Sequence, residues 1–128
     1  MSQRRQFNMK DLNHLPVVDN QLAIQLADDK KHIATDMLNL LIKTLPDEIS
    51  SIKQLYFSKK YHELQKQLHR LHGALCYCGT PRLKNVVAHL ESNIKNNIID
   101  NLPSLLDQFY FEVNLLLEYH SHHAPMQK

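Results

Sequence analysis

Glycine is scarce in this chain of 128 residues: there are only two, Gly73 and Gly79, and both lie in one short window. Sheet-rich domains of this size usually carry many turn glycines, so the scarcity argues against a sheet. Apolar residues instead recur at steps of three and four over long stretches, which is the spacing of one helix face. The sequence therefore predicts an all-α protein.

Charge of one sign, long apolar runs and cysteine are also scarce. Fifteen Lys and Arg against 13 Asp and Glu leave a formal charge of +2, which gives no electrostatic argument for nucleic acid or for a membrane surface. No apolar run approaches the roughly 20 residues of a membrane span, and the polar start lacks a signal-peptide core. The only cysteines, Cys76 and Cys78, are too close in sequence for a useful disulfide loop. We expect free thiols, a cytoplasmic location, no nucleic acid or membrane contact, and a monomer.

The apolar pattern divides the chain into three parts. Residues 1–15 show no sustained period and are interpreted as a tail or linker. Residues 16–120 carry four long amphipathic helices and one short N-terminal helix, whose apolar faces can be buried together in an antiparallel four-helix bundle. Residues 121–128 are expected to form a flexible tail. The length fits one domain.

The expected helices are delimited by capping residues and turn signals. Asp19 caps the short helix, which ends around Asp28. The first two long helices cover approximately 33–55 and 60–78. The fourth helix of the chain carries its apolar stripe over 83–94 and fades through Asn96 and Asn97, and the fifth carries its stripe over 102–117 and frays from Ser121. Pro46 removes a backbone hydrogen bond at a cost of about 3 kcal/mol, which predicts a kink or a short break near Leu45. Gly79 ends the third stretch, and Thr80 caps the next helix ahead of Pro81.

The position of Gly73 inside a helix requires a reason, because an interior glycine costs about 1 kcal/mol relative to alanine. At 100° per residue, Gly73 lies about 180° from Leu64 and its leucine stripe, so close packing does not explain it. A helical side chain covers the surface beside the residue four positions earlier. Gly73 therefore leaves one side of the His69 imidazole open to a partner.

His69 is the candidate phosphoryl acceptor. A solvent-exposed imidazole is largely neutral and nucleophilic near neutral pH. Lys66, Arg70 and His72 place donors around it, and His72 can offer an N–H to a group carried by His69. No carboxylate lies in the same turn, so magnesium and acidic groups would come from another protein. His72 is the alternative acceptor, although it lies nearer the core boundary, and a solvated His69 without a role is the simplest alternative.

Residues 68–90, LHRLHGALCYCGTPRLKNVVAHL, resemble the phosphohistidine helix and following helix of histidine-containing phosphotransfer (Hpt) domains. The similarity is greatest to the C-terminal Hpt domains of BarA-type tripartite hybrid sensor kinases and covers about residues 19–120. The family pattern H-x-x-K-G maps His69 onto the phosphorylated histidine and Gly73 onto the small residue behind it. His72 occupies the lysine position, where it replaces a permanent charge with a titrating one.

The resemblance implies a phosphorelay function, in which His69 carries a phosphoryl group between the aspartates of receiver domains. The implied partners are response-regulator receivers and a hybrid sensor kinase. The receiver would supply Mg²⁺, and this chain would bind no cofactor or metal. Lys66, Arg70 and Lys84 would offset charge or dock the receiver. Because no glycine-rich nucleotide loop is present, we expect a phosphoryl-transfer intermediate and not an ATP-dependent kinase.

Two other interpretations remain open: a helical interaction module without phosphate chemistry, and a metal- or haem-binding bundle. Cys76-Tyr77-Cys78 lacks the spacing of zinc sites. The terminal histidines, His120, His122 and His123, are expected in the tail, and Arg82 is expected to be an ordinary solvated charge.

Overall fold

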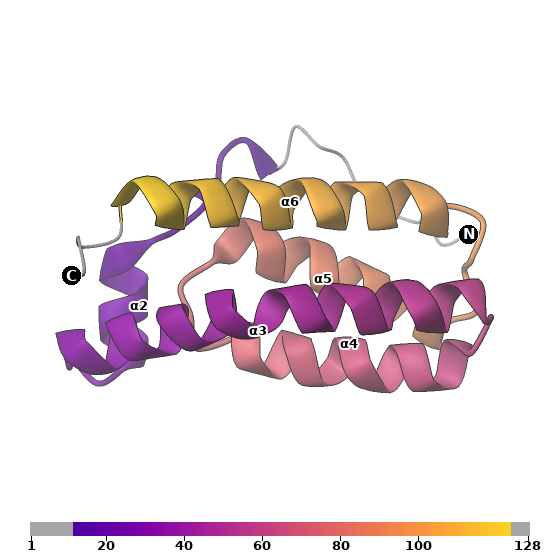
Figure 1. Cartoon of the computed structure of the whole chain (residues 1–128), viewed down its shortest axis with the longest axis horizontal. Helices are drawn as coiled ribbons and strands as arrows, with labels where there is room; N and C mark the ends of the chain where they lie inside the picture. Colours follow the sequence, from indigo (N-terminus) through magenta and orange to yellow (C-terminus); the bar gives the residue numbers. More distant parts are fainter. Residues whose placement is uncertain (1–11, 124–128) are drawn as a thin grey trace, which may run out of the picture.

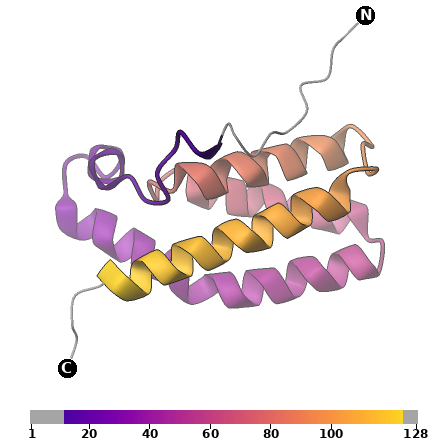
Figure 2. The same cartoon turned by 90° about the horizontal axis from the view of Figure 1, so that it is seen from above.

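The structure is a computed structural model that describes residues 12–123. Five helices lie wholly within that range: α2 (Asn20–Leu26), α3 (Lys31–Phe57), α4 (Tyr61–Leu75), α5 (Pro81–Lys95) and α6 (Leu102–His123). No strand occurs among these residues. The four long helices run side by side as a bundle, and α2 lies at one end beside the first turns of α3 (Figures 1 and 2). The predicted all-α bundle with an additional short helix is confirmed.

The core forms where the apolar stripes of α3 to α6 meet. Helix α4 packs against α5, α5 against α6, and α3 against both α4 and α6. The leucine stripe of α4 that the sequence identified is buried, with Leu64 and Leu68 fully inaccessible to solvent. Each such leucine contributes about 1.5–3 kcal/mol on leaving water. The same burial fixes the rotation of α4 and therefore the direction of its opposite, polar face.

The boundaries of two helices differ from the expected ones. Helix α3 continues through Pro46 without a break, because Leu41 and Leu45 before the proline and Ile52 after it are all held in the core. Helix α4 ends at Leu75, and residues 76–79 form a turn instead of extending the helix to residue 78. The expected connection at residues 58–60 is confirmed.

The predicted tails extend too far into the chain at both ends. Leu12 is fully buried and Leu15 packs against the core, so the bundle takes in residues before Pro16. The local pattern there is too short to reveal this burial. At the other end α6 continues to His123, and the His120 Nε2 atom lies 2.8 Å from Asn39 Oδ1 of α3. Residues 1–11 and 124–128 of the predicted tails lie outside the described residues.

Gly79 joins the α4–α5 hairpin to α2. It adopts φ +66°, a left-handed conformation that glycine tolerates best, and its carbonyl accepts a 2.8 Å hydrogen bond from the Asp19 N–H. Asp19 also caps α2 as predicted, accepting a 3.0 Å bond from Leu22 N–H. Thr80 occupies the expected cap position of α5, but its hydroxyl makes no cap hydrogen bond.

Replacement of Gly79 by alanine should lower the free energy of unfolding by about 2–3 kcal/mol, which urea denaturation measures. The new Cβ would lie 2.7 Å from both Ala23 Cβ and the Asp19 carbonyl oxygen, in addition to the strained φ. Gly73→Ala is the matched control, because its Cβ would meet nothing within 4 Å and the helix should gain stability. Equal unfolding midpoints for the two variants would contradict this account of Gly79.

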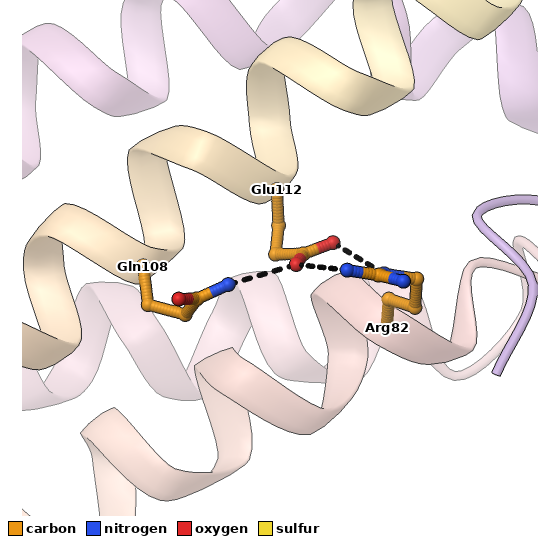
Figure 3. A network of polar contacts seen from close by, with 3 residues as sticks. All are labelled: Arg82, Gln108 and Glu112. Carbon is orange, nitrogen blue, oxygen red and sulfur yellow. Dashed lines mark hydrogen bonds and ion pairs between the residues drawn. The ribbon is translucent and has the colours of Figure 1, made fainter. Parts of the chain in front are cut away.

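A buried ion pair joins α5 to α6, contrary to the expectation that Arg82 is solvated. The Arg82 Nε atom donates a 2.8 Å hydrogen bond to Oε1 of Glu112, and the Nη2 atom donates a 2.8 Å bond to Oε2. Gln108 Nε2 donates a 2.9 Å bond to the same Oε2 atom (Figure 3). Glu112 is 1% exposed and Arg82 12%. The hydrogen bonds to Glu112 raise the pKa of Arg82. The sequence pattern did not show this pair, because its members lie 30 residues apart.

Candidate functional site

The outer face of α4 presents His69 to solvent. Its side chain is 75% exposed, whereas Leu68 on the opposite face is fully buried. Gly73, one turn later, is exposed, and a Cβ placed there would meet nothing within 4 Å. The exposure predicted for the imidazole and for the glycine beside it is therefore confirmed. His72 is less accessible, at 30%, in agreement with its position nearer the core boundary.

Basic side chains surround His69 on a shallow groove between α4 and α5. The groove is lined by His62, Gln65, Lys66, His69, Arg70, Glu91 and Lys95. Lys66 and Arg70 were predicted here, and both are exposed. Lys95 was not predicted, because it comes from the next helix. The groove offers an anion several cationic contacts around the exposed ring.

Lys84 lies on a second groove, which is largely apolar and includes His72. Leu22 and Leu26 of α2, Leu75 of α4 and Ala88 of α5 contribute to this surface. The sequence grouped Lys84 with Lys66 and Arg70, but the structure places it on this separate groove. The two grooves are adjacent because His69 and His72 lie on successive turns of one helix face.

A carboxylate also lies at the site, and the sequence interpretation missed it. The Nδ1 atom of His69 is 2.6 Å from Oε2 of Glu91, on α5, and the Nδ1 atom of His72 is 3.4 Å from Oε1 of the same residue. The hydrogen bond from His72 to a group carried by His69 stays a prediction. The sequence does contain a signal for this contact, because His69 lies eleven residues before Thr80 and Glu91 lies eleven residues after it. Residues equidistant from the turn of an antiparallel hairpin lie at the same level.

Residues 12–123 contain neither a metal-binding cluster nor a membrane-spanning helix. No group of three or more His, Cys, Asp or Glu side chains there could hold a metal ion, although two histidines and Glu91 lie close together. Over the same residues, no helix combines the length and apolar content needed to cross a bilayer. Both cysteines are free, and burial raises the pKa of the Cys78 thiol to about 11.

Comparison with known families identifies the chain. The family model described as the Hpt domain matches residues 36–121, which include all of α4 and α5. The chain belongs to the Hpt domain family. His69 on α4 and the neighbouring helix α5 both lie within the residues that the family model matches. The predicted resemblance is confirmed.

Relatives of this Hpt domain include a sensor protein and a signal transduction histidine-protein kinase. Sensor protein GacS of Pseudomonas syringae pv. syringae is 35% identical over 81 residues, which make up 63% of this chain and 9% of that protein. Histidine-protein kinase BarA of Escherichia coli K12 is 31% identical over 98 residues, 75% of this chain and 11% of the kinase. The chain thus spans about a tenth of the length of these relatives.

A solved structure supports the fold. The Hpt domain of a sensor hybrid histidine kinase from Shewanella matches with a TM-score of 0.70 and 24% identity. The match covers 85% of this chain and 97% of that domain. The four-helix arrangement with its additional short helix is therefore that of an Hpt domain.

Proposed function

We propose that this Hpt domain carries a phosphoryl group on His69 between the aspartates of receiver domains. The observation that carries the proposal is an imidazole that is 75% exposed on a rigid helix, next to a glycine with open space around it. Family membership supports the same role, because the relatives are signal-transducing histidine kinases. An interaction module without phosphate chemistry would not require open space beside the His69 ring. The open space therefore favours phosphotransfer over that alternative.

The transfer requires a positioned nucleophile more than elaborate machinery on this chain. A ring nitrogen of His69 attacks the phosphorus of a receiver's aspartyl phosphate, and a P–N bond forms as the P–O bond to aspartate breaks. The electron pair of the broken bond leaves with the carboxylate. The receiver supplies Mg²⁺ and the acidic pocket. The reverse reaction delivers the phosphoryl group to the next receiver.

Cationic residues of the chain have two separate tasks in this proposal. Lys66 and Arg70 line the groove that contains His69, and Lys95 joins them, so these side chains offset the charge of the phosphoryl oxygens. Lys84 lies on the apolar groove and contributes to receiver docking. The partners are receiver domains, including one in a hybrid sensor kinase, and the location is the cytoplasm.

Incubation with a phosphorylated receiver tests the proposal. We expect acid-labile, alkali-stable label to move onto the chain, and to move on to a second, unphosphorylated receiver. Omission of the receiver while ATP is present should give no label, because no nucleotide-binding loop is present. An absence of label with each of several receivers would favour the interaction module instead.

Gly73→Leu should slow transfer by about 100-fold, because a large side chain there covers one side of the His69 ring and misplaces the approaching phosphoryl group. The free energy of unfolding should stay the same or rise by up to about 1 kcal/mol, since leucine favours helix more than glycine. Gly73→Ala is the matched control: it should transfer at the wild-type rate, because its Cβ meets nothing within 4 Å. An unchanged rate in Gly73→Leu would contradict the access role of Gly73.

A further inference from the structure

The apolar groove contains a cysteine that the proposed phosphotransfer does not use. Cys76 follows the last residue of α4, four residues after His72, and both side chains line this groove. The side chain of Cys76 is half-buried, and its thiol makes no hydrogen bond within residues 12–123. The groove has a volume of about 300 Å³, which is at the lower end of the range of small-molecule sites. Cys76 is therefore a free nucleophile on the wall of a ligand-sized groove.

The other cysteine of the chain provides an internal contrast. Cys78 is 3% exposed, and its Sγ atom donates a 3.3 Å hydrogen bond to the carbonyl oxygen of Ala74. Burial raises the pKa of this thiol to about 11. Because the thiolate is the form that reacts with disulfides, Cys78 is protected both by its burial and by its proton. Only Cys76 is open to reaction in the folded protein.

The groove around Cys76 favours an anion. Its polar end is the N-terminus of α5, where Thr80, Pro81 and Lys84 line the groove and the first turn contains no acidic residue. A helix N-terminus carries partial positive charge. Lys84 adds a full charge, and no carboxylate of residues 12–123 pairs with it. No Asp or Glu is among the residues that line the groove, so its charge is positive.

The hydroxyl of Thr80 independently indicates a ligand at this end of the groove. Thr80 is 1% exposed, and its Oγ1 atom has no hydrogen-bond partner in the part of the chain that the structure describes. A buried hydroxyl without a partner costs free energy. A carboxylate at the N-terminus of α5 would accept a hydrogen bond from this hydroxyl and pair with Lys84. The polar end of the groove thus fits a carboxylate.

We propose that Cys76 is a modification site for small anionic disulfides, whose carboxylate binds at the N-terminus of α5 while the thiol of Cys76 reacts with the disulfide. The thiol releases its proton to solvent, and the thiolate attacks one sulfur of the ligand. A new S–S bond to Cys76 forms as the S–S bond of the ligand breaks. The other half of the ligand leaves as a thiolate with the electron pair. Cys76 is oxidised and the ligand is reduced, so no further oxidant is needed.

The adduct has a consequence for the relay, and this consequence rests on the proposed phosphotransfer function. It occupies the groove of Lys84, which contributes to receiver docking in that proposal. His69 lines the other groove, so the adduct leaves the phosphoryl acceptor itself unchanged. Modification of Cys76 therefore slows transfer by hindering docking, and reduction of the mixed disulfide restores it.

Reaction with the anionic disulfide dithiobis(nitrobenzoate) tests the site. One thiol per folded chain should react, and the reaction should be lost in Cys76→Ala and kept in Cys78→Ala, the matched control. Cys78 should react only after unfolding in urea. Peptide mass analysis of the wild type after incubation with oxidised glutathione should show one mixed disulfide, on Cys76. The mass analysis needs no variant, so it decides the site even where a substitution impairs folding.

Recognition of the anion is tested by comparing a charged and a neutral disulfide. Lys84→Gln should slow the reaction with dithiobis(nitrobenzoate) by about 3-fold, because it removes one surface charge contact. The reaction with neutral dithiodipyridine should be unchanged. Thr80→Val, which removes the hydroxyl, should slow the anionic reagent alone by a similar factor. Lys95→Gln is the matched control, because this lysine belongs to the same helix but lines the groove of His69.

Transfer from a phosphorylated receiver measures the consequence for the relay. The glutathione adduct of the wild type should accept label about 10-fold more slowly than the untreated protein, which corresponds to a partial loss of docking affinity. Dithiothreitol should restore the rate. Cys76→Ala, treated in the same way, should keep its own untreated rate. Circular dichroism establishes that the adduct stays folded.

Several results would overturn the inference. Equal reactivity of Cys78 in the folded protein, or an internal disulfide between the two cysteines, would contradict the assignment to Cys76. Equal slowing of both reagents in Lys84→Gln would show that the groove does not recognise the anion. An adduct that transfers at the untreated rate would refute the effect on docking. If the untreated wild type takes no label from any receiver, the proposed function fails, whereas the thiol measurements still decide whether Cys76 is the modification site.

Discussion

His69→Gln should abolish the acid-labile label that the chain accepts from a phosphorylated receiver. Glutamine has no ring nitrogen that can attack phosphorus, so the loss should be complete and not a reduction in rate. The side chain is 75% exposed, and substitutions at such positions change stability by about 0.5 kcal/mol or less. Unfolding therefore cannot account for the loss, and a urea titration of the variant verifies this.

His72→Gln is the matched control for that experiment, because it removes the other imidazole of the same helix face. The variant should still accumulate label, because it keeps the exposed ring of His69 that accepts the phosphoryl group. The opposite outcome, with label kept in His69→Gln and lost in His72→Gln, would assign the carrier role to His72.

Glu112→Ala should have the largest effect on stability, lowering the free energy of unfolding by about 3–5 kcal/mol. The carboxylate is 1% exposed and binds Arg82 through two hydrogen bonds, so its removal leaves a guanidinium that is 12% exposed without its partner. The hydrogen bond from Gln108 is lost as well. The urea midpoint and slope measure the change.

Two further variants separate charge burial from packing at this position. Glu118→Ala, which truncates an exposed glutamate of the same helix, should change stability by about 0.5 kcal/mol or less. The double variant Arg82→Met with Glu112→Leu should recover most of the loss, because apolar residues of similar size can replace a buried pair at little cost. A loss below about 1 kcal/mol in Glu112→Ala would show that the pair is not structurally important.

The helices themselves could be predicted from local spacing. Leucines at steps of three and four, among them Leu64 and Leu68, mark a stripe whose burial fixes the rotation of α4. His69 and Gly73 could then be placed on the opposite face by geometry alone. Helix ends were less predictable: α3 continues through Pro46 because core contacts on both sides outweigh the missing hydrogen bond.

Buried residues outside the periodic segments could not be predicted in the same way. Leu12 is fully buried, yet it has too few apolar neighbours in sequence to form a pattern. Arg82 was expected in solvent because charged residues usually are, and its partner Glu112 comes from another helix.

The sequence by itself determined the all-helical architecture, the exposed His69 and the open space at Gly73, because each depends on periodicity within one helix. Only the tertiary structure decided that Glu91 lies 2.6 Å from the His69 ring and that Arg82 is paired with Glu112. Those contacts depend on how α4, α5 and α6 are turned toward one another. That rotation results from the packing of the whole core, and no local spacing of residues encodes it.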